Sequence, residues 1–200
     1  MIQLSNTSKL ENLPKRYEHC KFENYIGNEE IVNELKAWKG SESVVLLGKV
    51  GTGKTHLAVS LMKNSPLFNY ERSIFNFGRW EVEKIQEKAR CLFLPVVELV
   101  FKLNDVVMSG GNKSEWIERY LSYNCLCLDD FGSEKITEAA RQNLYYIIDK
   151  RYRDMKPIII TSNLTMNEIN EYEPRIASRL VEMGKIIQIS GEDYRLKLGG

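Results

Sequence analysis

The stretch "SVVLLGKVGTGKT", residues 43–55, decides the fold of this chain. Residues 43–48 form a short apolar run with two adjacent valines, which predicts a buried strand. The loop that follows fits the pattern G-x-x-x-x-G-K-[ST], with Gly48 first and Lys54 and Thr55 last. The next residues, "THLAVSLMK" (55–63), continue as a helix. A buried strand, a glycine-rich loop and a helix in this order predict a phosphate-binding loop.

The chemistry of such a loop explains its spacing. Successive backbone N–H groups curl around a phosphate, and glycine allows the backbone to come that close. The N-terminus of the following helix adds a positive field. We expect the Lys54 ammonium to reach the β- and γ-phosphates of ATP and the Thr55 hydroxyl to coordinate Mg²⁺. The residues expected to bind the nucleotide here are Gly48, Lys49, Val50, Gly51, Thr52, Gly53, Lys54, Thr55 and His56.

Polar side chains follow two further apolar runs. The run "CLCLDD" (125–130) ends in two aspartates. A carboxylate at the end of a buried strand is costly without a positive partner, so we expect Asp129 to hold Mg²⁺ through its waters. Asp130 would then orient or deprotonate the attacking water. Asn163 ends "PIIITSN" (157–163) at the sheet edge where ligands bind, and its amide is expected to contact the γ-phosphate and that water.

Apolar runs alternate with helical patterns along the chain, which predicts an α/β fold with a five-stranded parallel sheet between helices. The expected strands are 43–48, a strand within 91–99 that runs into a helix, 125–130, 157–163 and 185–189. One long segment, 64–90, is aromatic and turn-like at first and then reads as a helix over "EVEKIQEKAR" (81–90). It is either a helical insertion packed on the core through Phe75, Phe77 and Trp80, or an extra partner-binding surface.

Composition sets broader limits. The chain has 200 residues, a net charge of +1 and no apolar run long enough to cross a membrane. Any contact with nucleic acid must therefore come from a local patch, and the candidate is 101–120, with Lys102, Lys113 and Trp116. Four cysteines without a C-x-x-C pair indicate a reducing, cytoplasmic compartment, and Cys20 by itself cannot build a zinc site. We expect residues 1–20 to be an N-terminal arm and 21–200 to be one domain.

The combination of motifs resembles a known family. The segments that carry the resemblance are "GKVGTGKTHLA", "LCLDDFGSEKITEAARQNLYYIIDKRY", "PIIITSNL", "RIASRL" and "GEDYR". Together they resemble the AAA+ ATPase domain of DnaC/DnaI-type replicative helicase loaders, and IstB-type transposition ATPases share much of the pattern. The resemblance implies a P-loop NTPase fold without a full C-terminal lid.

The resemblance also implies roles for particular residues. Lys54 and Thr55 would be the Walker A pair, Asp129 and Asp130 the Walker B pair, and Asn163 the first sensor. In "YIG" (25–27), Tyr25 and Ile26 would lie on the adenine side of the nucleotide, with Ile26 touching the base.

The stretch "PRIASRL", residues 174–180, places Arg175 and Arg179 four residues apart on one helical face and Ile176 and Leu180 on another. The apolar pair predicts a core stripe. Without other information the arginines would be read as a solvated face. The resemblance implies instead that Arg179 is an arginine finger that reaches the γ-phosphate bound by a neighbouring subunit, with Arg175 assisting.

The function implied is that of an ATP-dependent helicase loader in DNA replication. It would bind ATP, Mg²⁺ and single-stranded DNA, associate with itself, and deliver or remodel a hexameric replicative helicase. Hydrolysis would be slow and dependent on assembly, because Asp130 replaces the commoner and longer glutamate. The short N-terminal segment suggests either a loader of a phage or mobile element or an ATPase domain taken from a longer protein. Two alternatives remain open: an IstB-like transposition helper ATPase, and a protein that sequesters a helicase and hydrolyses ATP weakly.

Overall fold

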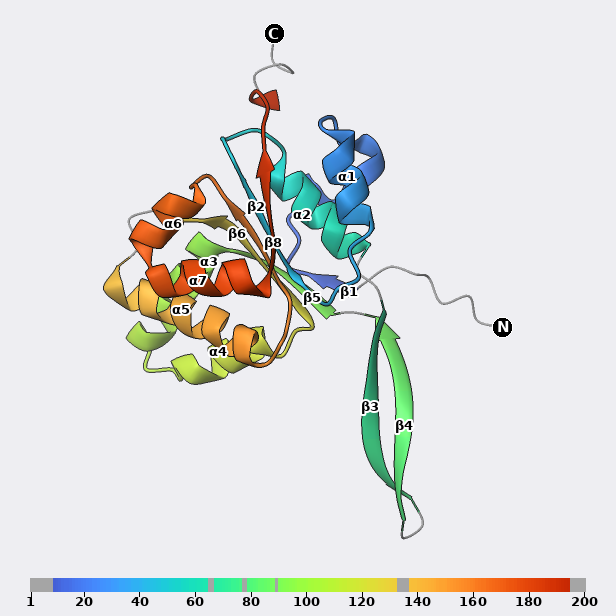
Figure 1. Cartoon of the computed structure of the whole chain (residues 1–200). Coiled ribbons are helices and arrows are strands. Elements are labelled where there is room, and N and C mark those ends of the chain that lie inside the picture. Colours follow the sequence, from blue (N-terminus) through green and yellow to red (C-terminus); the bar gives the residue numbers. More distant parts are fainter. Residues whose placement is uncertain (1–8, 65–66, 77–78, 89, 133–136, 195–200) are drawn as a thin grey trace.

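The structure, a computed structural model, describes residues 9–64, 67–76, 79–88, 90–132 and 137–194. Its centre is a six-stranded sheet in the order β1-β5-β6-β7-β2-β8, in which every pairing is parallel (Figure 1). The strands are β1 (Lys9–Glu11), β2 (Ser43–Gly48), β5 (Arg90–Pro95), β6 (Cys125–Phe131), β7 (Ile158–Ser162) and β8 (Gly184–Ile189).

Helices cover both faces of this sheet. One face carries α1 (Glu29–Lys36) and α2 (Lys54–Lys63), and the other face carries the later helices (Figure 1). The later helices are α3 (Val96–Met108), α4 (Lys113–Leu121), α5 (Glu138–Arg153), α6 (Met166–Tyr172) and α7 (Pro174–Met183). Two short 3-10 turns, Lys15–Tyr17 and Phe22–Asn24, precede α1. None of the helices in the described part of the chain is long and apolar enough to cross a membrane.

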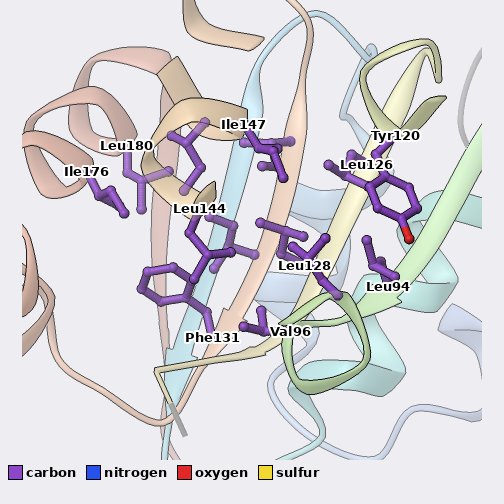
Figure 2. Close-up of a cluster of buried hydrophobic side chains, with 14 of the residues drawn as sticks. Leu94, Val96, Tyr120, Leu126, Leu128, Phe131, Leu144, Ile147, Ile176 and Leu180 are labelled. Atoms are coloured by element: carbon purple, nitrogen blue, oxygen red, sulfur yellow. The ribbon is translucent and has the colours of Figure 1, made fainter. Parts of the chain in front are cut away.

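The alternation of side chains along the strands divides the core into two layers. Val45 and Leu47 of β2 face the layer under α3, α5 and α7, whereas Val44 and Leu46 face α1 and α2. Figure 2 shows part of the first layer, where Ile176 and Leu180 of α7 point toward the sheet beside Leu144. Ile176 and Leu180 are fully buried, which confirms the predicted core stripe of α7.

The predicted sheet of five strands has one strand fewer than the sheet in the structure. Residues 9–11, within the expected N-terminal arm, pair with β5 as an edge strand, and Cys20 at the end of that arm is buried. A three-residue edge strand has too short a pattern to be recognised from sequence, because it is defined by pairing with a distant segment. Residues 1–8 lie outside the described part of the chain.

The helix expected over 81–90 was wrong. Strands β3 (Leu67–Asn76) and β4 (Arg79–Lys88) instead form an antiparallel ribbon that extends away from the sheet (Figure 1). The glutamates and lysines of this segment favour a helix only weakly, and ten backbone pairings between the two strands outweigh that preference. The expected core contacts of Phe75, Phe77 and Trp80 fall outside the side chains that the structure describes.

Candidate nucleotide-binding site

The phosphate-binding loop leaves β2 at Gly48 and enters α2 through Gly53. Gly53 is the N-cap of α2 and has φ of 87°, in the left-handed region that favours glycine. A Cβ atom on Gly48 would lie 2.3 Å from the carbonyl oxygen of Ile189. The loop therefore needs glycine at these two positions, one for its backbone angle and one for its approach to β8.

Lys54 and Thr55 occupy the first turn of α2 and face the centre of the loop. The Lys54 side chain is buried, and its Nζ donates to the carbonyl oxygens of Gly48 at 2.9 Å and Lys49 at 2.7 Å. Thr55 Oγ1 donates to Asp129 Oδ1 at 3.0 Å. A cation and a hydroxyl are thus held beside a loop of backbone N–H groups, as binding of a triphosphate requires.

Asp129 is buried at the carboxyl end of β6. Its Oδ1 accepts one hydrogen bond from Thr55 and another from Thr161 Oγ1 at 2.6 Å. Burial raises the pKa of this carboxyl group above the ordinary value, and the two hydroxyl donors oppose that rise. The Thr55 hydroxyl and the Asp129 carboxylate are hard oxygen donors close together, so these residues fit the coordination chemistry of Mg²⁺.

Asp130 lies at an irregularity in the pairing of β6 with β7, between Leu128 and Phe131. Its φ is 57°, an uncommon backbone conformation for a residue other than glycine, and its side chain is exposed. The Asp130 N–H donates to Thr161 Oγ1 at 3.0 Å. One threonine hydroxyl on β7 thus bridges both aspartates. Thr161 was missed from the sequence, where its only signal is a hydroxyl residue within the apolar run before Asn163.

A cavity of about 440 Å³ is lined by eight of the sixteen predicted site residues. Lys54, Thr55, Asp130 and Asn163 all line it. The cavity has a further wall that sequence analysis did not assign, made by Arg16, Tyr17, His19, Cys20 and Tyr194. The residues of this wall become neighbours of the loop only through the tertiary fold.

The two residues expected on the adenine side differ in their surroundings. The Tyr25 hydroxyl donates to the carbonyl of Thr52 at 3.3 Å, and the Tyr25 ring lies against Gly53. Ile26 is 65% exposed, and neither Tyr25 nor Ile26 is among the residues that line the cavity. The segment just before it, 16–20, supplies cavity-lining side chains instead.

Arg175 and Arg179 lie outside the cavity, on α7. Arg175 Nε and Nη2 donate to the two carboxylate oxygens of Glu173, at 2.8 and 2.9 Å. Arg179 Nε donates to Asp149 Oδ1 at 2.7 Å, and Arg179 Nη2 donates to the Tyr145 hydroxyl at 2.9 Å. The two arginines are thus held by carboxylates of their own chain and do not contribute to the cavity of that chain.

Comparison with known proteins bears on this site. Residues 80–199 match the family described as "IstB-like ATP binding protein". A putative ATP-binding protein of insertion sequence IS21 from Pseudomonas aeruginosa is 29% identical over 164 residues, which cover 78% of this chain and 54% of that protein. The chain spans roughly half the length of the first curated relatives that it matches.

Solved structures share the fold. The crystal structure of the DnaC helicase loader superposes on this chain with a TM-score of 0.67 at 22% sequence identity. The match covers 88% of this chain and 100% of the DnaC chain. The initiator DnaA bound to AMPPCP and single-stranded DNA has a TM-score of 0.64 at 22% identity, over 91% of this chain and 52% of that one. With the phosphate-binding loop, the two aspartates and the parallel sheet in place, this chain has the AAA+ P-loop NTPase fold, and it belongs to the family of IstB-like ATP-binding proteins.

Proposed function

We propose that this protein hydrolyses ATP with Mg²⁺. The observation that carries this proposal is the convergence of Lys54, Thr55, Asp130 and Asn163 on one cavity, with Asp129 bonded to Thr55. Lys54 would contact the β- and γ-phosphates, while Thr55 and Asp129 would hold Mg²⁺, which neutralises phosphate charge when bound. Asp130 and Asn163 would orient the attacking water. Lys54→Ala should abolish nucleotide binding, and retention of ATP affinity in this variant would contradict the proposal.

Hydrolysis would take place between subunits. The described residues that line the cavity include one arginine, Arg16, and it belongs to the wall formed by 16–20 rather than to the sheet edge with Asp130 and Asn163. Arg179 lies on α7, a helix whose apolar face is buried, and would reach a second copy by leaving its contact with Asp149. A cation from a neighbouring subunit would stabilise the charge that develops on the phosphates.

We further propose that the assembled ATPase loads a hexameric helicase onto single-stranded DNA. A groove of about 630 Å³ runs along α3 and α4 beside β1 and β5, at the β1 edge of the sheet. Phe101, which lines it, is 73% exposed and can stack on a base. Lys102 Nζ lies 4.4 Å from the centre of the Trp116 ring, and Arg119 lies 5.3 Å from it, so the face of Trp116 is already used by cations. Phe101 is therefore a better stacking candidate than Trp116, with Lys102 and Arg119 as phosphate contacts.

The ribbon of β3 and β4 is the proposed contact with the helicase. A two-stranded ribbon is marginally stable by itself in water. Its ten paired positions extend away from the domain (Figure 1), so it can reach a partner without disturbing the nucleotide site.

A pull-down against a replicative helicase, with and without ATP, tests the loader proposal. The native chain should retain the helicase. A variant in which residues 66–89 are replaced by a short glycine-serine turn should lose the helicase but still bind ATP. Failure of the native chain to retain any replicative helicase would contradict the proposal.

A second candidate is a transposition helper ATPase. It is supported by the family match and by the IS21 relative. The same pull-down with a transposase separates the two candidates, because retention of transposase without helicase favours the helper.

A further inference from the structure

Three potential metal ligands meet beside α2. His19 and Cys20 come from the turn that follows the first 3-10 helix, and His56 comes from the first turn of α2. One ligand atom from each residue lies within 4.8 Å of the others. The sequence separates His56 from the other two by more than thirty residues, which is why Cys20 was not expected to have metal-binding partners.

The orientation of His56 is suited to a ligand. Its Nε2 lies 2.8 Å from the carbonyl oxygen of Lys21, and a carbonyl can only accept, so Nε2 carries the hydrogen. The unprotonated nitrogen is then Nδ1. A histidine that donates one ring N–H to a backbone carbonyl while its other nitrogen binds a metal is the usual arrangement in protein metal sites.

The turn that carries His19 and Cys20 is held by the same helix that carries His56. Lys63, two turns further along α2, donates from Nζ to the carbonyl oxygens of Glu18 at 2.6 Å and Cys20 at 2.9 Å. Asn24 Nδ2 donates to the carbonyl oxygen of His19 at 2.8 Å. The ligands therefore need little rearrangement on binding. Burial raises the pKa of the Cys20 thiol, and the Lys63 ammonium nearby opposes that rise.

We propose that His19, Cys20 and His56 form a Zn²⁺ site, distinct from the Mg²⁺ site at Thr55 and Asp129. Two imidazoles and a thiolate are soft ligands that select zinc over magnesium. Three protein ligands leave a fourth tetrahedral position open, and it would take water from the nucleotide cavity, which all three residues line. Binding releases the Cys20 proton to solvent. The ion would join the N-terminal segment to α2 and so stiffen one wall of the nucleotide cavity.

Titration of the full metal-free chain with Co²⁺ tests the site, because a cobalt ion bound by thiolate shows a charge-transfer band in the near ultraviolet. We expect one such ion per chain, displaced by one equivalent of Zn²⁺, and no competition from millimolar Mg²⁺. Cys20→Ala should abolish the band, whereas Cys91→Ala, which removes a thiol buried elsewhere in the same core layer, should keep it.

His19→Asn keeps the test decisive if Cys20→Ala fails to fold, because His19 is exposed and its loss should not disturb the core. This variant should bind the metal at least ~10-fold more weakly. Lys54→Ala, which lacks nucleotide binding if the proposed ATPase is correct, should keep the band, so the two proposals fail separately. Absence of a charge-transfer band in the native chain, or unchanged affinity in His19→Asn, would overturn the site.

Discussion

Arg179 on α7 donates from Nε to Asp149 Oδ1 on α5 at 2.7 Å. The other carboxylate oxygen of Asp149 accepts from Arg153. Both partners are largely shielded, with side chains 22% and 14% exposed. The residue proposed to act on a neighbouring subunit is therefore also part of the packing of its own chain. Loss of activity on mutation of Arg179 would not by itself establish a role in catalysis.

A matched pair of variants separates the two roles of Arg179. Arg179→Ala and Asp149→Ala both break the contact, and each should cost about 1–2 kcal/mol of unfolding free energy. Only Arg179→Ala should lose the ATP hydrolysis that depends on assembly, while ATP affinity of the dilute monomer is unchanged in both. Thermal melts measure the loss of stability, and hydrolysis rates at several protein concentrations measure the activity that depends on assembly. Equal loss of hydrolysis in both variants would make Arg179 a structural residue.

Thr161 is predicted to position both aspartates. Thr161→Val keeps the shape of the side chain but removes the hydroxyl that bonds Asp129 Oδ1 and the Asp130 N–H. We expect hydrolysis to fall roughly 10–100-fold, because small displacements of reacting groups are costly, and the Mg²⁺ concentration for half-maximal rate to rise. Thr161→Ser restores the hydroxyl and should restore both quantities. An unchanged Mg²⁺ dependence in the valine variant would argue against this role.

Asp129 should destabilise the protein when neither nucleotide nor Mg²⁺ is bound. Because burial raises its pKa, the folded chain holds this proton more tightly than the unfolded chain. The contribution of Asp129 to stability therefore falls as pH rises from the ordinary aspartate range through the raised value. Asp129→Asn removes this loss of stability. It should raise the melting temperature at pH 7 by about 2–4 °C, which corresponds to an unfolding free energy on the order of 1 kcal/mol.

Melts of the apoprotein across pH test the Asp129 prediction. The difference between native chain and Asp129→Asn should vanish below about pH 3, where the carboxyl group is protonated in both the folded and the unfolded state. Glu171→Gln is the control, because the Glu171 side chain is exposed on α6 and its replacement should leave the melting curve nearly unchanged. A lower midpoint for Asp129→Asn at pH 7 would show that the charge is well compensated in the folded chain.

The α3–α4 groove is predicted to bind single-stranded DNA through few charges. Lys102→Ala should reduce the slope of log K against log salt concentration by about 0.7. Lys39→Ala removes an exposed charge just after α1, on the opposite face of the sheet, and should leave the slope unchanged. Phe101→Ala should weaken binding without changing the slope, because stacking does not depend on counterions. Equal slopes for native chain and Lys102→Ala would place the DNA elsewhere.

Much of the fold and of the nucleotide site could be predicted from the sequence because these features are local. The phosphate-binding loop is a continuous segment whose glycines meet backbone requirements at Gly48 and Gly53. Asp129, Asp130 and Asn163 each follow an apolar run, and parallel strands bring such ends to one edge. The buried faces of Ile176 and Leu180 follow from helical periodicity alone.

Other features depend on contacts between distant segments, and only the tertiary structure decided them. Backbone pairing made 79–88 a strand although its composition favours a helix. The Thr161 hydroxyl acquires its two partners because β6 and β7 are adjacent. His19 and Cys20 approach His56 because Lys63 holds their turn on α2. The sequence by itself determined the phosphate-binding loop, because its residues are contiguous. The fold determined which side chains surround that loop, since non-local contacts leave no periodic or spaced signal in a single chain.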